Sequence, residues 1–166
     1  MKAERFETAE EARPALALGL LDCLGSPDPQ LRDGIAYEAL STWLRAGLLS
    51  PPLRRQLRER LYASLQARDA DGYTAPFAVL VLSEIARTDR IEPWMTPQER
   101  ADMVGRAASW LASVRDYRGF RDGEGWRHAV AHGADWAMQL AINGQVDRAQ
   151  LELLLQAVST QVVPPD

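Results

Sequence analysis

Polar side chains that could do chemistry recur at helical spacing in residues 126–143, WRHAVAHGADWAMQLAIN. If this stretch is one helix, four of them lie on one face, within about 60° of one another. They are His128, His132, Asp135 and Gln139. The positions around them are apolar or small, which is typical of a buried helix, and buried polar groups need partners. This polar stripe is the strongest candidate site in the sequence, although it does not define a reaction.

A metal site is one interpretation of the stripe. His128 and His132 stand four residues apart, a separation at which two imidazoles on a helix can bind one metal ion. Asp135 would complete a set of two histidines and one carboxylate for zinc, manganese, iron or nickel. The metalloprotease pattern H-E-x-x-H is not matched, because Ala129 stands where the general-base glutamate would be. Any further ligand must be a carboxylate, such as Asp33, Asp116, Asp122 or Glu124.

Two other interpretations of the same residues stay open. The stripe could be a buried hydrogen-bond network that locks this helix to its neighbours. It could equally be a metal-free acid–base or ligand-binding site.

The glycine-rich loop DYRGFRDGEG, residues 116–125, leads directly into the stripe. Long irregular loops in compact domains often carry function, and its two arginines, Arg118 and Arg121, could grip an anionic ligand. Asp116 and Arg118 could equally brace the end of a helix. If the region is functional, we expect Asp122 or Glu124 to be catalytic. The expected ligand-binding residues are Arg118, Arg121, Trp126, Gln139 and Asp33.

The elements that must position these residues are all predicted to be helices. Cap and proline signals mark helix starts at Asp28-Pro29, Ser50-Pro51, Thr74, Thr96-Pro97 with Glu99, and Asp147 with Gln150. The run FAVLVL, residues 77–82, could be a buried strand, but no second strand exists to pair with it, so it predicts a core helix. Near the N-terminus, Thr8 and Glu11 predict a capping box, and Pro14 separates a short first helix from a second piece over 15–24.

The spacing of these starts suggests a repeat. Starts near residues 28, 50, 74 and 96 are 22 to 24 residues apart, so a helix pair recurs at about 46 residues, close to the ~40–47 of HEAT and armadillo repeats. We therefore expect one all-α domain over residues 1–166, with about seven helices in stacked antiparallel hairpins. An irregular helical bundle is the alternative. Residues 1–27 hold the N-terminal helices and a linker.

Charged residues away from the stripe have ordinary explanations. Arg54, Arg55 and Arg58 are predicted to face solvent, diluted by neighbouring polar residues. Glu84 could be a buried acid, but we expect it to face solvent between apolar neighbours. Asp33 stands near a helix start, where the helix dipole favours an acidic side chain.

The composition excludes several classes of protein. A net charge of −4 and a pI near 5.3 argue against nucleic-acid or anionic-membrane binding. No apolar run reaches the ~18 residues of a membrane helix, and the N-terminus has no signal-peptide core. The single Cys23 excludes an internal disulfide and suits the cytoplasm. Nucleophile-elbow, P-loop, Rossmann and Cys-x-x-Cys motifs are missing from the sequence.

Three stretches carry a resemblance to a known family: LRDGIAYEALSTWL (31–44), APFAVLVLSEIARTD (75–89) and DYRGFRDGEGWRHAVAHGADWAMQLA (116–141). Over about residues 28–160 the chain resembles the bacterial family named domain of unknown function 2785. The resemblance implies an all-helical fold and no assigned activity. It directs attention to Asp33, Asp116, Arg118, Gly119, Gly125, Trp126, His128, His132 and Asp135. Members of that family continue with further helical sequence, so we expect this chain to be a truncated form.

Three hypotheses follow for the function. The first is a helical-repeat-like binding module whose polar pocket recognises a small molecule or a protein segment. The second is a metal-dependent hydrolase in which His128, His132 and Asp135 bind the ion. The third is a purely structural polar network. The sequence leaves open whether the chain is an enzyme and whether it forms a homodimer.

Overall fold

A computed structural model describes residues 6–66 and 70–162 of the 166-residue chain. The all-α prediction is confirmed, since helices account for most of the described chain and the strands are confined to one short hairpin. The helices are α1 (Arg13–Leu20), α2 (Pro29–Leu31), α3 (Glu38–Arg45), α4 (Pro51–Ser64), α5 (Thr74–Ile91), α6 (Pro97–Ser113), α7 (Ala129–Ala141) and α8 (Arg148–Val162). A 3₁₀ turn (Leu21–Cys23) follows α1, and a π-helical segment (Arg32–Tyr37) joins α2 to α3. The hairpin pairs β1 (Phe120–Arg121) with β2 (Gly125–Trp126).

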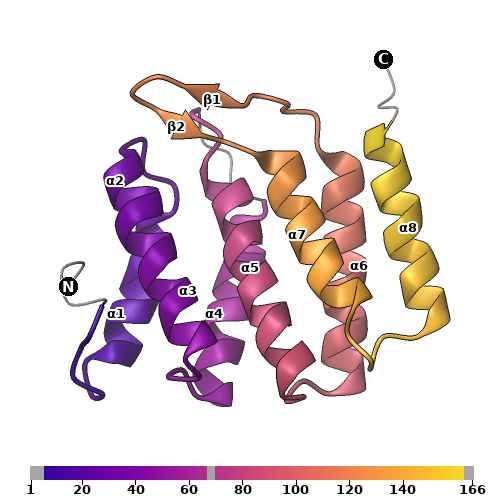
Figure 1. The fold of residues 1–166 in the computed structure, drawn as a ribbon, viewed down its shortest axis with the longest axis horizontal. Helices are drawn as coiled ribbons and strands as arrows, with labels where there is room; N and C mark the ends of the chain where they lie inside the picture. Colours follow the sequence, from indigo (N-terminus) through magenta and orange to yellow (C-terminus); the bar gives the residue numbers. More distant parts are fainter. Residues whose placement is uncertain (1–5, 67–69, 163–166) are drawn as a thin grey trace.

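The helices stack as a sequential array (Figure 1). The run α2–α3, α5 and α7 lie side by side, with α5 packed against both neighbours. A second layer packs α4 against α5 and α6 against α7, and α8 extends it beside α6. The hairpin lies across the end of the array where α7 begins.

Local signals placed the helix starts correctly. Thr96 and Glu99 form a reciprocal capping box at α6, with hydrogen bonds of 2.8 and 3.1 Å. Asp147 and Gln150 exchange the same pair of bonds before α8, at 3.0 and 2.9 Å. The run FAVLVL lies inside α5, as predicted, and not in a strand.

The N-terminal predictions need correction. The capping box at Thr8 does not form, and α1 begins at Arg13 with Pro14 in its first turn. Proline is favourable there because the first turn leaves its missing N–H without a helical acceptor. The predicted helix from Asp28 does start with that cap, but it is α-helical only in part, because the π-helical segment interrupts it.

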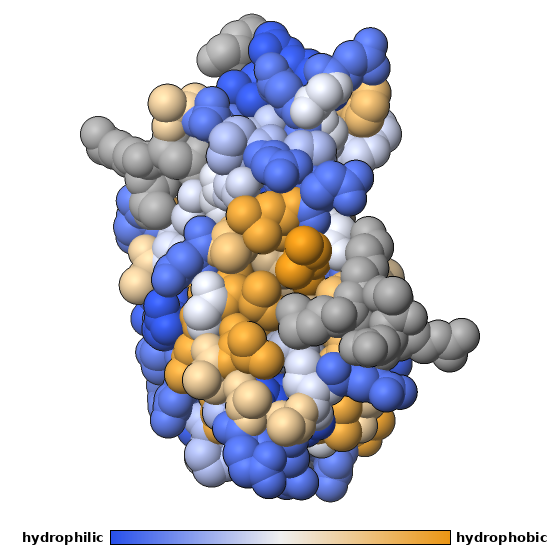
Figure 2. All heavy atoms as spheres, turned by 90° about the vertical axis from the view of Figure 1, so that its left-hand side faces the viewer, coloured by the Kyte–Doolittle hydropathy of each residue, from blue (hydrophilic) through white to orange (hydrophobic). Residues whose placement is uncertain are grey.

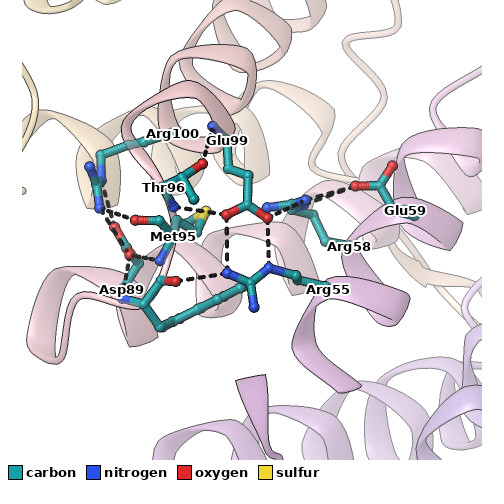
Figure 3. A network of polar contacts seen from close by, with 9 residues as sticks. Arg55, Arg58, Glu59, Asp89, Met95, Thr96, Glu99 and Arg100 are labelled. Atoms are coloured by element: carbon teal, nitrogen blue, oxygen red, sulfur yellow. Dashed lines mark hydrogen bonds and ion pairs between the residues drawn. The ribbon is translucent and has the colours of Figure 1, made fainter. Parts of the chain in front are cut away.

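Two predictions of exposed charges are wrong. Arg54 and Arg58 are 7 % and 6 % exposed. Arg58 donates to Glu99 of α6, a partner 41 residues away (Figure 3). Glu84 is also buried and receives two hydrogen bonds from Arg45. A buried charge needs such a partner, and residue spacing within one helix does not reveal it.

The network in Figure 3 joins α4, α5 and α6 through two carboxylates. Glu99 accepts from Arg55 at 2.7 Å and from Arg58 at 3.1 Å. Asp89 is fully buried and accepts from Arg100 at 2.7 Å, and also from the backbone N–H groups of Trp94 and Met95. These bonds fix the turn between α5 and α6.

Both ends of the array carry apolar side chains that the described chain leaves uncovered. At the α1 end, Figure 2 shows an apolar patch on the face of the molecule. Leu16 and Leu20 of α1 and Ile35 of the π-helical segment are half-buried. At the other end, Leu155 and Val162 of α8 are exposed. None of the described helices has the length and apolar character needed to cross a membrane.

Candidate functional site

The stripe-bearing helix starts later than predicted, and this changes the site. α7 begins at Ala129, Trp126 belongs to β2, and His128 is the residue that caps the helix start. His128 has φ 53° and ψ 33°, in the left-handed region. The reason is the hairpin: pairing of Phe120 with Trp126 holds the chain extended, so the backbone must turn sharply before α7. A side chain is rarely found at positive φ.

Of the four polar residues, His132, Asp135 and Gln139 lie within α7 and keep their helical spacing, but their exposure differs. His132 points into the core, where it is 7 % exposed, whereas Asp135 is exposed. Gln139 accepts a hydrogen bond of 3.0 Å from Arg90 of α5. His128 lies outside the helix, so the helical angle used to align it with His132 does not apply.

His132 is held as a neutral imidazole by its surroundings. Its Nδ1 lies 3.0 Å from the carbonyl oxygen of Pro76, and its ring meets Phe77 edge-on at 5.1 Å. Burial lowers its pKa to about 4, so the ring is uncharged at neutral pH. Beside a carbonyl, Nδ1 must carry the proton, which leaves Nε2 as the acceptor.

An aromatic stack lies on the outer side of the hairpin. The rings of Trp126 and His128 are 3.9 Å apart and nearly parallel, at 19°. Phe120 packs on the same indole at 5.2 Å. Trp126 and Phe120 are nevertheless 47 % and 54 % exposed. Large aromatic surfaces that stay exposed are typical of recognition sites.

Beside this stack lies a cleft of about 390 Å³, here named the α7 cleft. It is bounded by the loop before β1, the start of α7 and the end of α8 (Figure 1). Its lining residues are Asp116, Tyr117, Arg118, Gly119, His128, Ala129, Val130, Ala131, Ala134 and Gln161. The structure thus brings together four residues that the sequence analysis singled out: Asp116, Arg118, Gly119 and His128.

The charges at the rim of the α7 cleft are already paired. Asp116 accepts from the backbone N–H of Arg118 at 3.0 Å and from its Nε at 2.9 Å. Hydrogen bonding to Arg118 lowers the pKa of Asp116, so the pair is ionised at neutral pH. Arg121 lies 3.7 Å from Glu124. The two arginines expected to grip an anion therefore each have a carboxylate partner within the loop.

Arg32 anchors the hairpin and was missed as a site residue by sequence reasoning. Its side chain is completely buried, donates to the carbonyl oxygen of Glu124 at 2.8 Å, and lies 3.9 Å from the centre of the Tyr73 ring. Gly125, at φ 78°, passes so close that a Cβ there would lie 3.0 Å from the Arg32 guanidinium. The signal available was the Arg-Asp pair at 32–33, since Asp33 forms an ion pair of 2.9 Å with Arg32.

The residues proposed as catalytic do not converge on the α7 cleft. Glu124 accepts from Arg127 at 2.9 Å, and this bond lowers its pKa. Asp122 is exposed in the hairpin turn. Burial raises the pKa of Asp33, which is tied to Arg32 away from the cleft lining.

The predicted metal ligands are only partly together. The rings of His128 and His132 are 5.9 Å apart with a 46° tilt. Across residues 6–66 and 70–162, no three side chains of His, Cys, Asp or Glu are grouped so that they could hold an ion.

One comparison with known proteins gives a match. The model of the family described as "Protein of unknown function (DUF2785)" matches residues 61–165. Comparison with curated proteins and with solved structures finds no match.

Proposed function

Because the chain belongs to this family of unknown function, we propose a role from the geometry: a binding module that holds its ligand in the α7 cleft. The ligand is a small molecule or a short peptide segment with an apolar group and hydrogen-bonding groups. The chain acts by recognition and not by chemistry on the ligand.

The observation that carries this proposal is the conformation of His128. A histidine at positive φ costs stability that glycine would not, and it makes no side-chain capping bond in return. Its imidazole is instead stacked on Trp126 at the mouth of the cleft. Backbone strain retained beside a cavity supports a functional site.

The lining decides the class of ligand. Val130, Ala131 and Ala134 of α7 give the cleft an apolar floor, and His128 adds a ring nitrogen at its rim. Arg118 and Asp116 neutralise each other, so a strongly anionic ligand gains little here. These features suit a ligand of mixed apolar and polar character.

The arrangement of the helices supports the repeat-like part of the proposal. In HEAT-type arrays each helix packs on its neighbour and on the equivalent helix of the next pair. The contacts between equivalent helices are present here, since α3 packs on α5, α5 on α7 and α6 on α8. Binding on an exposed edge of such an array is a common use of this architecture.

The test is a screen of short peptides and uncharged metabolites by thermal shift, followed by ¹H–¹⁵N spectra of the hits. We expect hits to shift the amides of Arg118, His128 and Ala131. They should lose affinity in Ala134→Trp, which fills the floor, but not in the matched exposed variant Ala141→Trp at the far end of α7. Hits that map elsewhere, or that bind both variants equally, would overturn the proposal.

A metal-dependent hydrolase is the second candidate, and one observation favours it. Histidines that bind metals usually donate their other nitrogen to a carbonyl, as His132 does toward Pro76. Elemental analysis of untagged protein, with His128→Ala and His132→Ala as controls, tests this candidate. Near-stoichiometric metal that both variants lose would support it, and protein that takes up no metal from excess ions would remove it.

A further inference from the structure

A second cavity, here named the α4–α6 cleft, lies between the end of α4 and the side of α6. It has a volume of about 560 Å³, within the range of small-molecule sites. Tyr62, Leu65 and Gln66 of the α4 end form one wall, and α6 forms the other with Gly105, Arg106 and Trp110. It shares no lining residue with the α7 cleft.

Among residues 6–66 and 70–162, the hydroxyl of Tyr62 finds no hydrogen-bond partner, although the residue is only 6 % exposed. Burial raises the pKa of this hydroxyl, so it keeps its proton and can donate. A buried polar group that stays unpaired costs stability, and native proteins rarely keep one without a purpose. The unmet need at this wall is for a hydrogen-bond acceptor.

A second donor without an acceptor among the described residues belongs to a neighbouring ring. The indole N–H of Trp136, in the fully buried part of α7, has no acceptor either. The Trp136 and Tyr62 rings are 6.5 Å apart. Trp136 is fully buried and is not among the described lining residues, so the case for a group supplied from outside the chain rests on the Tyr62 hydroxyl.

Gly105 marks the space that such a group would use. It lies inside α6, where glycine is less favourable than alanine by about 1 kcal/mol. A Cβ at this position would meet no atom within 4 Å. Packing against the described residues therefore does not explain the glycine. The absence of a side chain at this position instead keeps the wall of the cleft open.

The remaining lining sets the charge and shape of the occupant. Arg106 lies 4.4 Å from the centre of the Tyr62 ring and is paired with Asp102 at 2.8 Å. Since these charges cancel, the described lining of the cleft gives no net attraction for an ion. The rings of Tyr62 and Trp110 give it flat walls.

We propose that the α4–α6 cleft binds a small, uncharged, planar molecule whose carbonyl or amide oxygen accepts a hydrogen bond from the Tyr62 hydroxyl. This site is independent of the α7 cleft, and the two proposals can fail separately.

The test uses three probes that share one phenyl ring: benzamide, benzoate and toluene. Benzamide has the acceptor and no charge, benzoate has the charge, and toluene lacks the acceptor. In ¹H–¹⁵N spectra of the full chain we expect benzamide to shift the Gly105 amide and the Trp136 indole N–H, with millimolar affinity typical of a fragment. Benzoate and toluene should bind at least about fivefold more weakly.

Two variants and one control complete the experiment. Tyr62→Phe should weaken benzamide binding about fivefold while leaving the melting temperature unchanged or higher, because it removes an unpaired hydroxyl. Gly105→Leu should abolish binding by filling the cleft. Tyr37→Phe is the control, since Tyr37 contacts Glu84 and does not line this cleft.

Three outcomes would overturn the proposal. The first is unchanged benzamide binding in Tyr62→Phe or Gly105→Leu. The second is equal binding of all three probes, or binding of none. The third is a clear fall in melting temperature for Tyr62→Phe, which would show that ordered water already satisfies the hydroxyl.

Discussion

Replacing His128 with glycine and with alanine separates the cost of its backbone conformation from the value of its ring. The φ of 53° is in the left-handed region, which costs an ordinary residue about 1–2 kcal/mol and glycine nothing. The stack on Trp126 contributes about 0.5–1.5 kcal/mol in the other direction. Each substitution changes these two quantities differently.

Alanine keeps the backbone cost and loses the stack, so His128→Ala should be less stable than the natural protein by about 1 kcal/mol. Glycine loses the stack and removes the backbone cost, but it stabilises the unfolded chain by about 0.4–1 kcal/mol because it gives that chain more conformational freedom. His128→Gly should therefore lie within about 0.5 kcal/mol of the natural protein and above His128→Ala. This order is the reverse of helix propensity.

Urea unfolding followed by circular dichroism measures the difference, and 1 kcal/mol corresponds to about 2–4 °C in melting temperature for a chain of this size. Ala131→Gly, inside the same helix and exposed, is the control. There glycine should cost about 1 kcal/mol. If His128→Gly is less stable than His128→Ala, the residue is not strained, and the main support for the binding module is lost.

Three further predictions concern packing and pH. A Cβ on Gly133 would lie 2.7 Å from Leu111, so Gly133→Ala should lower the free energy of unfolding by about 1–2 kcal/mol in urea titrations, despite the better helix propensity of alanine. His132 has a pKa of about 4 in the folded chain, below its value in the unfolded chain, so stability should fall as the pH is lowered from 6.5 to 4. In His132→Asn, melting temperatures measured across that range should lack this part of the pH dependence. Hydrogen bonds from Arg55 lower the pKa of Glu99 to about 2. The contribution of the ionised carboxylate to the free energy of unfolding is therefore complete above pH 4.5 and is lost toward pH 2. Glu99→Gln should reduce the dependence of stability on pH in that range, measured by acid unfolding.

Local chemistry made the helix starts predictable from sequence. The caps at Thr96 and Asp147 involve residues three positions apart, so the sequence contains both partners side by side. The apolar run in α5 was assigned correctly because a strand needs a partner and none was available. Features of this kind depend on few residues and little on the rest of the fold.

Long-range contacts account for the errors. Arg58 can be buried because it donates a hydrogen bond to Glu99 of α6. Glu84 can be buried because it accepts one from Arg45 of α3. No pattern within α4 or α5 contains that information. His128 left the predicted helix for a similar reason, since a hairpin anchored by Arg32 fixes where α7 can begin.

The sequence therefore identified residues of the candidate site but not their arrangement in space. Arg118 and His128 do line one cleft, and Trp126 stacks beside them. His128 stands just before α7 with a left-handed backbone, so the single continuous helix that the prediction assumed begins one residue after it.

The bonds to Asp89 suggest an order of events during folding. Its partners Trp94, Met95 and Arg100 lie within eleven residues along the chain, whereas Asn143, at 3.0 Å, comes from 54 residues away. Contacts between near neighbours close small loops and form quickly. The turn between α5 and α6 can thus nucleate early, with one acceptor lone pair still open to solvent. When the end of α7 packs against this turn, Asn143 would donate the last hydrogen bond to the Asp89 carboxylate. This bond would fix the position of α7 relative to α5.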